Sequence, residues 1–201
     1  MLRKRIALLQ RRPDLSFQDF DAHWAIPHAT LIAALPGLGE YVQNPVRSFW
    51  TNGDPGATLD GIVEVWFDDA AVASPEAHTS TAQQDDEVRF IRTLTAFTVT
   101  RRESYDPPAK VWVLSPEPLD LAHLGPAAAH RAAIVTAPEA DTRLMERPRL
   151  LREAAPPAAI AVLPVTVEES GEVFDAVVAA LSRESAPPCV RVLRTTTRRV
   201  R

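Results

Sequence analysis

The segment HATLIAALPGLGEYVQNP, residues 28–45, decides the fold because a degraded copy of it follows about a hundred residues later. The copy is HRAAIVTAPEADTRLMERP, residues 130–148. Self-similarity at a fixed spacing indicates a repeated structural unit. The sequence therefore predicts two copies of one unit, the first well preserved and the second degraded. With one inserted residue, the alignment pairs His28 with His130, Pro36 with Pro138 and Pro45 with Pro148.

The patterns around residues 28–45 give the first unit, residues 1–104, the order β-α-β-β-α-β of a ferredoxin-like fold. Apolar residues recur at three- and four-residue steps from Phe17 to Leu35, which predicts a helix that Pro27 interrupts. Ser16 is its expected N-cap, and Asp68 with Asp69 is expected to cap the second helix. The expected elements are strands over 5–10, 41–49, 62–67 and 96–102, a helix over 17–35 and a helical region over 69–91.

The second unit, residues 109–201, follows the linker Asp106-Pro107-Pro108. Its apolar pattern is weaker, but it predicts the same order of elements. The expected elements are strands over 110–114, 143–153, 158–167 and 190–200, an alanine-rich helical region split at Gly125-Pro126, and a helix over 173–181. The fold class is therefore α+β, with two ferredoxin-like units in one chain.

Composition excludes several classes of protein. The chain of 201 residues is 46% apolar and 24% charged, which is typical of a globular protein. A net charge of −4 gives no general attraction to nucleic acid or to a membrane surface, so neither is expected as a partner. Cys189 is the only cysteine, which excludes an internal disulfide and a cysteine-based metal cage. The basic start, residues 1–10, has too short an apolar run for a secretion signal, so a cytoplasmic protein is expected.

Four motifs in the first unit together resemble the EthD family. They are FDAHWAIPHA at 20–29, LPGL at 35–38, YVQN at 41–44 and GIVEVWFD at 61–68, and the resemblance covers roughly residues 3–103. EthD-like proteins belong to the dimeric α+β barrel superfamily. The resemblance implies that two antiparallel sheets pack into a barrel, with helices outside and a ligand cavity between sheet and helices. In this chain both units would form that barrel intramolecularly, so a monomer (a pseudo-dimer) or a homodimer is expected.

His28 is the leading candidate for a catalytic residue. It lies within the apolar stripe of the first helix, and an imidazole can accept or donate a proton near neutral pH. The alternative is a buried histidine that only fixes the helix through hydrogen bonds. His23 is the second candidate. Five residues on an ideal helix place it about 140° away from His28, and a kink at Pro27 is the alternative that would bring the two closer. No metal site is expected, because the spacing of the two histidines is unsuitable and no acid accompanies them on that helix.

The remaining candidates would bind the substrate. Tyr41 and Asn44 would orient a polar group, while Trp24, Trp66 and Phe90 would supply apolar walls. These aromatic residues would equally fill an empty core. Glu64 alternates with Val63 and Val65, which places it in the barrel interior if the valines face the helices. A buried carboxylate needs a partner, and Arg47 or an arginine of the second unit is expected to pair with it.

The leading hypothesis is an EthD-like protein that binds a small apolar or aromatic molecule. There it would perform cofactor-free proton transfer with His28 as acid or base, in an isomerisation, a dehydration or an oxidoreductase-associated step. No phosphate-binding loop or nucleophile elbow is present, so no cofactor is expected. The alternative is a non-catalytic ligand-binding or structural accessory protein. A closed, dry cavity beside His28 favours the second reading, and an open one with polar walls favours the first.

Overall fold

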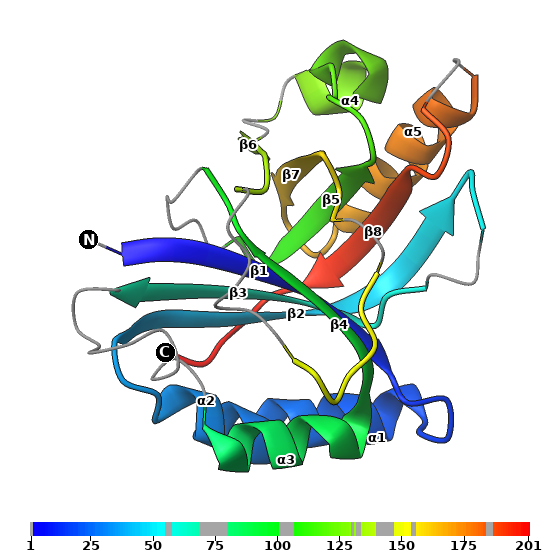
Figure 1. Cartoon of the computed structure of the whole chain (residues 1–201). Helices are drawn as coiled ribbons and strands as arrows, with labels where there is room; N and C mark the ends of the chain where they lie inside the picture. The colour runs from blue at the N-terminus through cyan, green and yellow to red at the C-terminus, as the bar shows by residue number, and fades with distance from the viewer. Residues whose placement is uncertain are drawn as a thin grey trace.

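The computed structural model describes residues 2–54, 58–68, 80–100, 107–129, 131, 134–139, 147–153, 156–183 and 187–201. In this part of the chain nine strands form one curled antiparallel sheet, and helices cover its outer face at both ends (Figure 1). The α+β class predicted from the sequence is confirmed. None of the helices described is long and apolar enough to cross a membrane.

The first unit has the predicted order β-α-β-β-α-β. Its first helix starts at the expected cap, since Ser16 Oγ accepts a hydrogen bond of 3.0 Å from the amide of Asp19. Pro27 then converts the helix into one π-helical turn. The elements are β1 (Leu2–Arg11), α1 (Phe17–His23), η1 (Trp24–His28), α2 (Ala29–Ala33), β2 (Leu38–Thr51), β3 (Gly61–Asp68), α3 (Thr81–Phe90) and β4 (Ile91–Thr98).

The second unit repeats this order with shorter strands and a longer second helix. Its first helical region consists of two short pieces, as expected for an alanine-rich segment split by Gly125-Pro126. Its second helix is amphipathic and buries Val173, Val177 and Leu181 against the sheet. The elements are β5 (Ala109–Ser115), η5 (Leu121–Leu124), α4 (Pro126–Ala129), β6 (Ile134–Thr136), β7 (Ala159–Val165), α5 (Ser170–Arg183), β8 (Arg191–Thr196) and β9 (Arg198–Arg199).

The strand order is β4-β1-β3-β2-β8-β5-β7-β6. It contains the ferredoxin-like order twice, because the fourth, first, third and second strands of each unit follow one another. The units are joined through β2, whose first half pairs with β3 and whose second half pairs with β8. Pro45 lies where β2 passes from one partner to the other, a bulge-like position that tolerates a residue without an amide hydrogen.

The segments that follow β4 and β6, the two outer strands of this path, also meet. Val99 and Pro138 form a bridge, the amide of Thr100 donates to the carbonyl of Ala137 at 3.0 Å, and the amide of Glu139 donates to the carbonyl of Thr98 at 2.7 Å. The sheet therefore curls far enough for its edges to make contact, in agreement with the expected barrel made by both units of one chain.

The alignment of the two copies is wrong, although the two units share one topology. Residues 130–138 were aligned with the helix after His28, but Ile134–Thr136 form strand β6. The strand expected over 143–153 is not formed by its described part, where residues 147–153 make a turn and a single bridge from Leu151 to Thr93. Three-residue β6 gives too short a periodic signal for its position to be read from the sequence. The predictions for His130, Asp69 and residues 140–146 concern positions outside the described residues.

Three layers of apolar side chains hold the fold together. One cluster fills the barrel interior with residues of both units, including Ile6, Phe97, Trp112 and Leu193. The second layer lies between the first-unit sheet and its helices and holds two clusters, one around Phe20 and one around Tyr41. The third lies between the second-unit sheet and α5. The candidate site lies in the second layer, where polar residues interrupt the apolar packing.

Gly61 is expected to be intolerant of even a methyl group. A Cβ atom at this position would lie 2.5 Å and 2.6 Å from two carbons of the rigid, buried indole of Trp24. We expect Gly61→Ala to lower the free energy of unfolding by about 2–3 kcal/mol, the usual effect of overpacking, as measured by urea denaturation. Gly171→Ala is the control, since its nearest neighbour would be 3.9 Å away. A loss of equal size in both variants would contradict this explanation.

Candidate functional site

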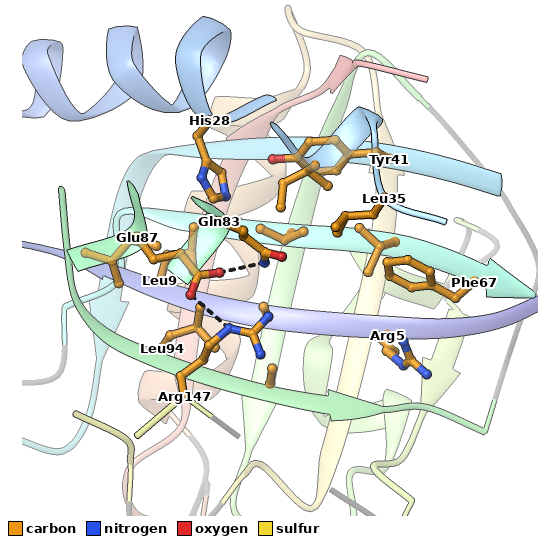
Figure 2. Close-up of a pocket in the computed structure, with 16 residues that line it drawn as sticks. Arg5, Leu9, His28, Leu35, Tyr41, Phe67, Gln83, Glu87, Leu94 and Arg147 are labelled. Carbon is orange, nitrogen blue, oxygen red and sulfur yellow. Dashed lines mark hydrogen bonds and ion pairs between the residues drawn. The ribbon is translucent and has the colours of Figure 1, made fainter. Parts of the chain in front are cut away.

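A cavity lies between the first-unit sheet and helices α2 and α3 (Figure 2). Its volume is about 70 Å3, several times the roughly 10–15 Å3 that one water molecule needs. The sheet provides apolar walls, and polar side chains gather where α3 passes over the sheet. The lining residues are Arg5, Ala7, Leu9, His28, Ile32, Leu35, Tyr41, Val63, Val65, Phe67, Gln83, Glu87, Ile91, Leu94, Ala96 and Arg147.

The π-helical turn brings His23 and His28 to one carboxylate. A π turn places residues five apart on the same face, because its hydrogen bonds join residue i to residue i+5. His23 Nε2 lies 2.9 Å from Asp86 Oδ1, and His28 Nδ1 lies 3.0 Å from Asp86 Oδ2. The expectation that the two histidines lie on different faces is therefore wrong. Its cause is Pro27, which has no amide hydrogen for the regular helical bond.

His28 points into the cavity (Figure 2) and is 5% exposed. Burial lowers its pKa from 6.5 to about 4, and the hydrogen bond and charge of Asp86 offset only part of that effect. The ring is thus neutral at pH 7. A carboxylate can only accept hydrogen bonds, so the hydrogen-bond network assigns the proton of His28 to Nδ1. Nε2 then carries the lone pair and is the basic atom of the ring.

Glu87 is an acidic residue in the cavity lining, and its carboxylate accepts two hydrogen bonds. Gln83 Nε2 donates to Glu87 Oε1 at 2.7 Å, and Arg147 Nε donates to Glu87 Oε2 at 2.8 Å. Burial raises the pKa of Glu87, while the charge of Arg147 lowers it without cancelling the rise. Arg147 belongs to the second unit, whose segment 147–153 lies along β4 through hydrogen bonds of Leu151. The site of the first unit is therefore completed by the second unit.

Tyr41 lines the cavity from β2. Its hydroxyl accepts hydrogen bonds from Trp24 Nε1 at 3.2 Å and from Gln43 Nε2 at 2.7 Å. Burial raises the pKa of Tyr41, so the phenol stays neutral at any ordinary pH. Trp24 fixes Tyr41 without lining the cavity itself. Phe90 also lies behind the lining and packs against both histidines, at ring-centroid distances of 4.8 Å to His23 and 4.9 Å to His28.

Asn44, Glu64 and Trp66 lie on the other face of the sheet, inside the barrel, and do not line this cavity. Glu64 does face the interior, as its alternation with the valines predicted. Its partners are lysines and not the expected arginine: Lys4 Nζ lies 2.7 Å from Oε1, and Lys110 of the second unit contacts Oε2. Asn44 Nδ2 donates to Oε2 at 3.0 Å. These contacts give Glu64 and Asn44 a place in the packing between the units.

Sequence reasoning missed Gln83, Asp86, Glu87 and Arg147. Gln83, Glu87 and Phe90 follow one another at four- and three-residue spacing and so share one helix face, and Phe90 marks that face as the buried one. Asp86, three residues after Gln83, lies on the same face. This spacing was the signal in the sequence from which Gln83, Asp86 and Glu87 could have been found. Within the described residues, no group of three or more His, Cys, Asp or Glu side chains is arranged to hold a metal ion.

Comparison with known proteins gives two positive findings. Residues 12–93 match the model of the EthD domain family, and this range contains the helices of the first unit and most of the cavity lining. A solved structure of a "putative monooxygenase" from Lactobacillus acidophilus is similar at 11% sequence identity and a TM-score of 0.38, over 100% of this chain and 94% of that chain. No curated protein matches the chain significantly.

Proposed function

Since residues 12–93 match the model of the EthD domain family, we propose that the cavity between sheet and helices binds a small apolar or aromatic molecule and that His28 transfers a proton there. The observation that supports this most directly is a neutral, buried imidazole at the polar end of an apolar cavity. Apolar walls with a few convergent polar groups are typical of small-molecule sites.

The chemistry follows from the state of His28. Nδ1–H donates to Asp86, which orients the ring and stabilises the imidazolium that forms when Nε2 takes a proton. His23 donates to the other oxygen of Asp86 and fixes that carboxylate. Tyr41 stays neutral beside the cavity and provides a hydroxyl for a carbonyl or enolate oxygen. Such a set of groups suits isomerisation, dehydration or the deprotonation that precedes oxygenation, without a bound cofactor.

The alternative is a carrier that binds the same molecule without changing it. The mostly apolar lining supports this reading as well, because it explains affinity without catalysis. Loss of polar groups would be expected of a carrier, whereas His28, Gln83, Glu87 and Tyr41 all line the cavity. We favour proton transfer for that reason. Whether the protein is an enzyme or a carrier, the two units of one chain form the barrel together. We therefore propose that it is a monomer or a homodimer in solution.

His28→Gln is the test of the catalytic reading. The full chain is incubated in deuterated buffer with small phenols, enones and β-ketoesters, and deuterium incorporation is followed by NMR. We expect the variant to lose about 100-fold or more of the exchange rate, the usual contribution of a general base. The wild-type rate is expected to stay constant from pH 7 to pH 5, because the pKa of His28 is about 4 and the base stays unprotonated above it.

His123→Ala is the control, since it removes an exposed histidine of the second unit. If His28→Gln leaves the exchange of every accepted compound unchanged, the catalytic reading is wrong. Binding that survives in that case supports the carrier.

A further inference from the structure

Gln83 has a buried hydrogen-bond acceptor to which none of the described residues donates. Its side chain is on α3 and the residue is 3% exposed. Nε2 donates to Glu87, but Oε1 has no hydrogen-bond partner among the described residues. An unsatisfied buried acceptor costs roughly 1–3 kcal/mol, so such atoms are rare unless something else satisfies them.

The orientation of this amide is fixed by its neighbours. Exchanging the oxygen and the nitrogen would place Oε1 against the carboxylate of Glu87, which offers no proton while it is ionised. Arg147 holds that carboxylate from the other side at 2.8 Å. Nε2 therefore faces Glu87 and Oε1 is turned away from it, toward the centre of the cavity (Figure 2).

The surroundings of Oε1 select the kind of group that satisfies it. The acceptor requires a hydrogen-bond donor. Arg5 and Arg147 both line the cavity, and their charges disfavour a cationic donor such as an ammonium group. The cavity walls are mostly apolar and include Leu9, Ile91 and Leu94. The remaining choice is a neutral donor on an apolar body.

We propose that Gln83 Oε1 is the anchor for a hydroxyl group of the ligand, so that the cavity takes neutral, hydroxylated apolar molecules of the phenol class. This assignment rests on the proposed function, since it assumes that the cavity binds a small molecule. The anchored hydroxyl is distinct from the proton that His28 transfers. Gln83 is thus a specificity-determining residue, because it separates hydroxylated molecules from their ethers and hydrocarbons.

The test compares three probes of nearly one shape: 4-methylphenol, 4-methylanisole and toluene. Each is titrated into the 15N-labelled full chain, and the side-chain NH2 signals of Gln83 report binding by NMR. We expect 4-methylphenol to bind about five- to tenfold tighter than toluene, the size of one hydrogen bond to a buried acceptor. The ether, which has no donor, is expected to bind no tighter than toluene.

Gln83→Met keeps the shape of the side chain and removes the acceptor. We expect it to abolish the preference for 4-methylphenol while toluene binding changes little, measured by calorimetry. Gln84→Met is the matched control, with the same substitution one position along α3 and outside the cavity lining. A disturbed cavity would weaken all three probes together, so the ratio of affinities isolates the hydrogen bond.

Each outcome decides a separate question. If none of the probes binds, the proposed function itself fails. If toluene and 4-methylphenol bind equally to the wild type, the cavity stands and the role of Gln83 is overturned. A preference that survives in Gln83→Met also overturns it.

Discussion

Glu64→Gln is expected to lower the free energy of unfolding at pH 7 by about 3–5 kcal/mol, the effect of breaking a buried ion pair. The substitution keeps the shape of the side chain and removes the negative charge between two ammonium groups. The side chains of Glu64, Lys4 and Lys110 are 2%, 11% and 1% exposed, so water does not replace the lost charge. Lys110 belongs to the second unit, and the loss therefore weakens the contact between the two units.

The difference in the free energy of unfolding between wild type and Glu64→Gln is expected to depend on pH. Burial by itself raises the pKa of Glu64, but the charges and hydrogen bonds of Lys4 and Lys110 outweigh it and leave the pKa below the ordinary 4.5. A carboxyl group whose pKa is lowered by folding stabilises the fold at a pH above the pKa that it has in the unfolded chain. This stabilisation is lost as the pH falls through the lowered pKa. Urea denaturation should therefore show a large difference between wild type and variant at pH 7, which shrinks below about pH 4.5.

Glu40→Gln is the matched control on the neighbouring strand, since Glu40 pairs with Arg199 near the surface at 3.5 Å. It is expected to change the free energy of unfolding by less than about 1 kcal/mol. A triple variant, Lys4→Met with Glu64→Leu and Lys110→Met, removes every charge and should regain most of the loss. A stable Glu64→Gln protein would show that the three charges do not hold the units together.

Arg147→Met is expected to raise the pKa of Glu87 further and to lower the free energy of unfolding by about 3 kcal/mol at pH 8. Arg147 is 13% and Glu87 3% exposed at their side chains, and the substitution removes the cation that partly offsets the burial of Glu87. A carboxyl group whose pKa is raised by folding stabilises the fold at a pH below the pKa that it has in the unfolded chain. It destabilises the fold as the pH rises above that pKa. The stability of the variant should therefore fall from pH 5 to pH 8 more steeply than that of the wild type.

The titration of Glu87 is measured by 13C NMR of the chain labelled at its glutamate carboxyl carbons. Arg149→Ala is the control, because Arg149 lies on the same segment and pairs with Asp85, which is half exposed. We expect that control to leave the titration of Glu87 in place. If the pKa of Glu87 is unchanged in Arg147→Met, or shifts equally in Arg149→Ala, Arg147 does not control the charge of Glu87.

The sequence predicted the first three strands of the first unit well, because they are apolar runs next to proline or glycine turns. The fourth strand was predicted over 96–102, whereas β4 spans Ile91–Thr98 and follows α3 directly, without a proline or glycine to mark the change. Val63 and Val65 placed Glu64 inside the barrel, since a strand has only two faces. The repeat predicted the common topology of both units but not the position of β6. The similarity between the two copies depends on a few matching prolines and histidines, which do not fix the position of a strand. The pairing of β6 with β7 depends on backbone hydrogen bonds over three residues, too few to show a pattern in the sequence.

The candidate site was harder to predict for two physical reasons. A regular helix separates His23 from His28, and only the wider turn at Pro27 brings both rings to Asp86. Asp86, Gln83 and Glu87 lie on a helix whose residues are mostly polar, so Phe90 alone marks its buried face and no apolar stripe does. Arg147 lies sixty residues along the chain from Glu87, a proximity that no local pattern records.

The Arg147–Glu87 contact has a consequence for how such a barrel can evolve. In an assembly of two identical chains, every substitution occurs twice and must suit both halves of the symmetric pair. Here the halves are covalently continuous, so the C-terminal half is free to acquire residues that serve its neighbour alone. The chain can thus specialise one half for chemistry and the other for support, an asymmetry that a homodimer of identical subunits cannot encode.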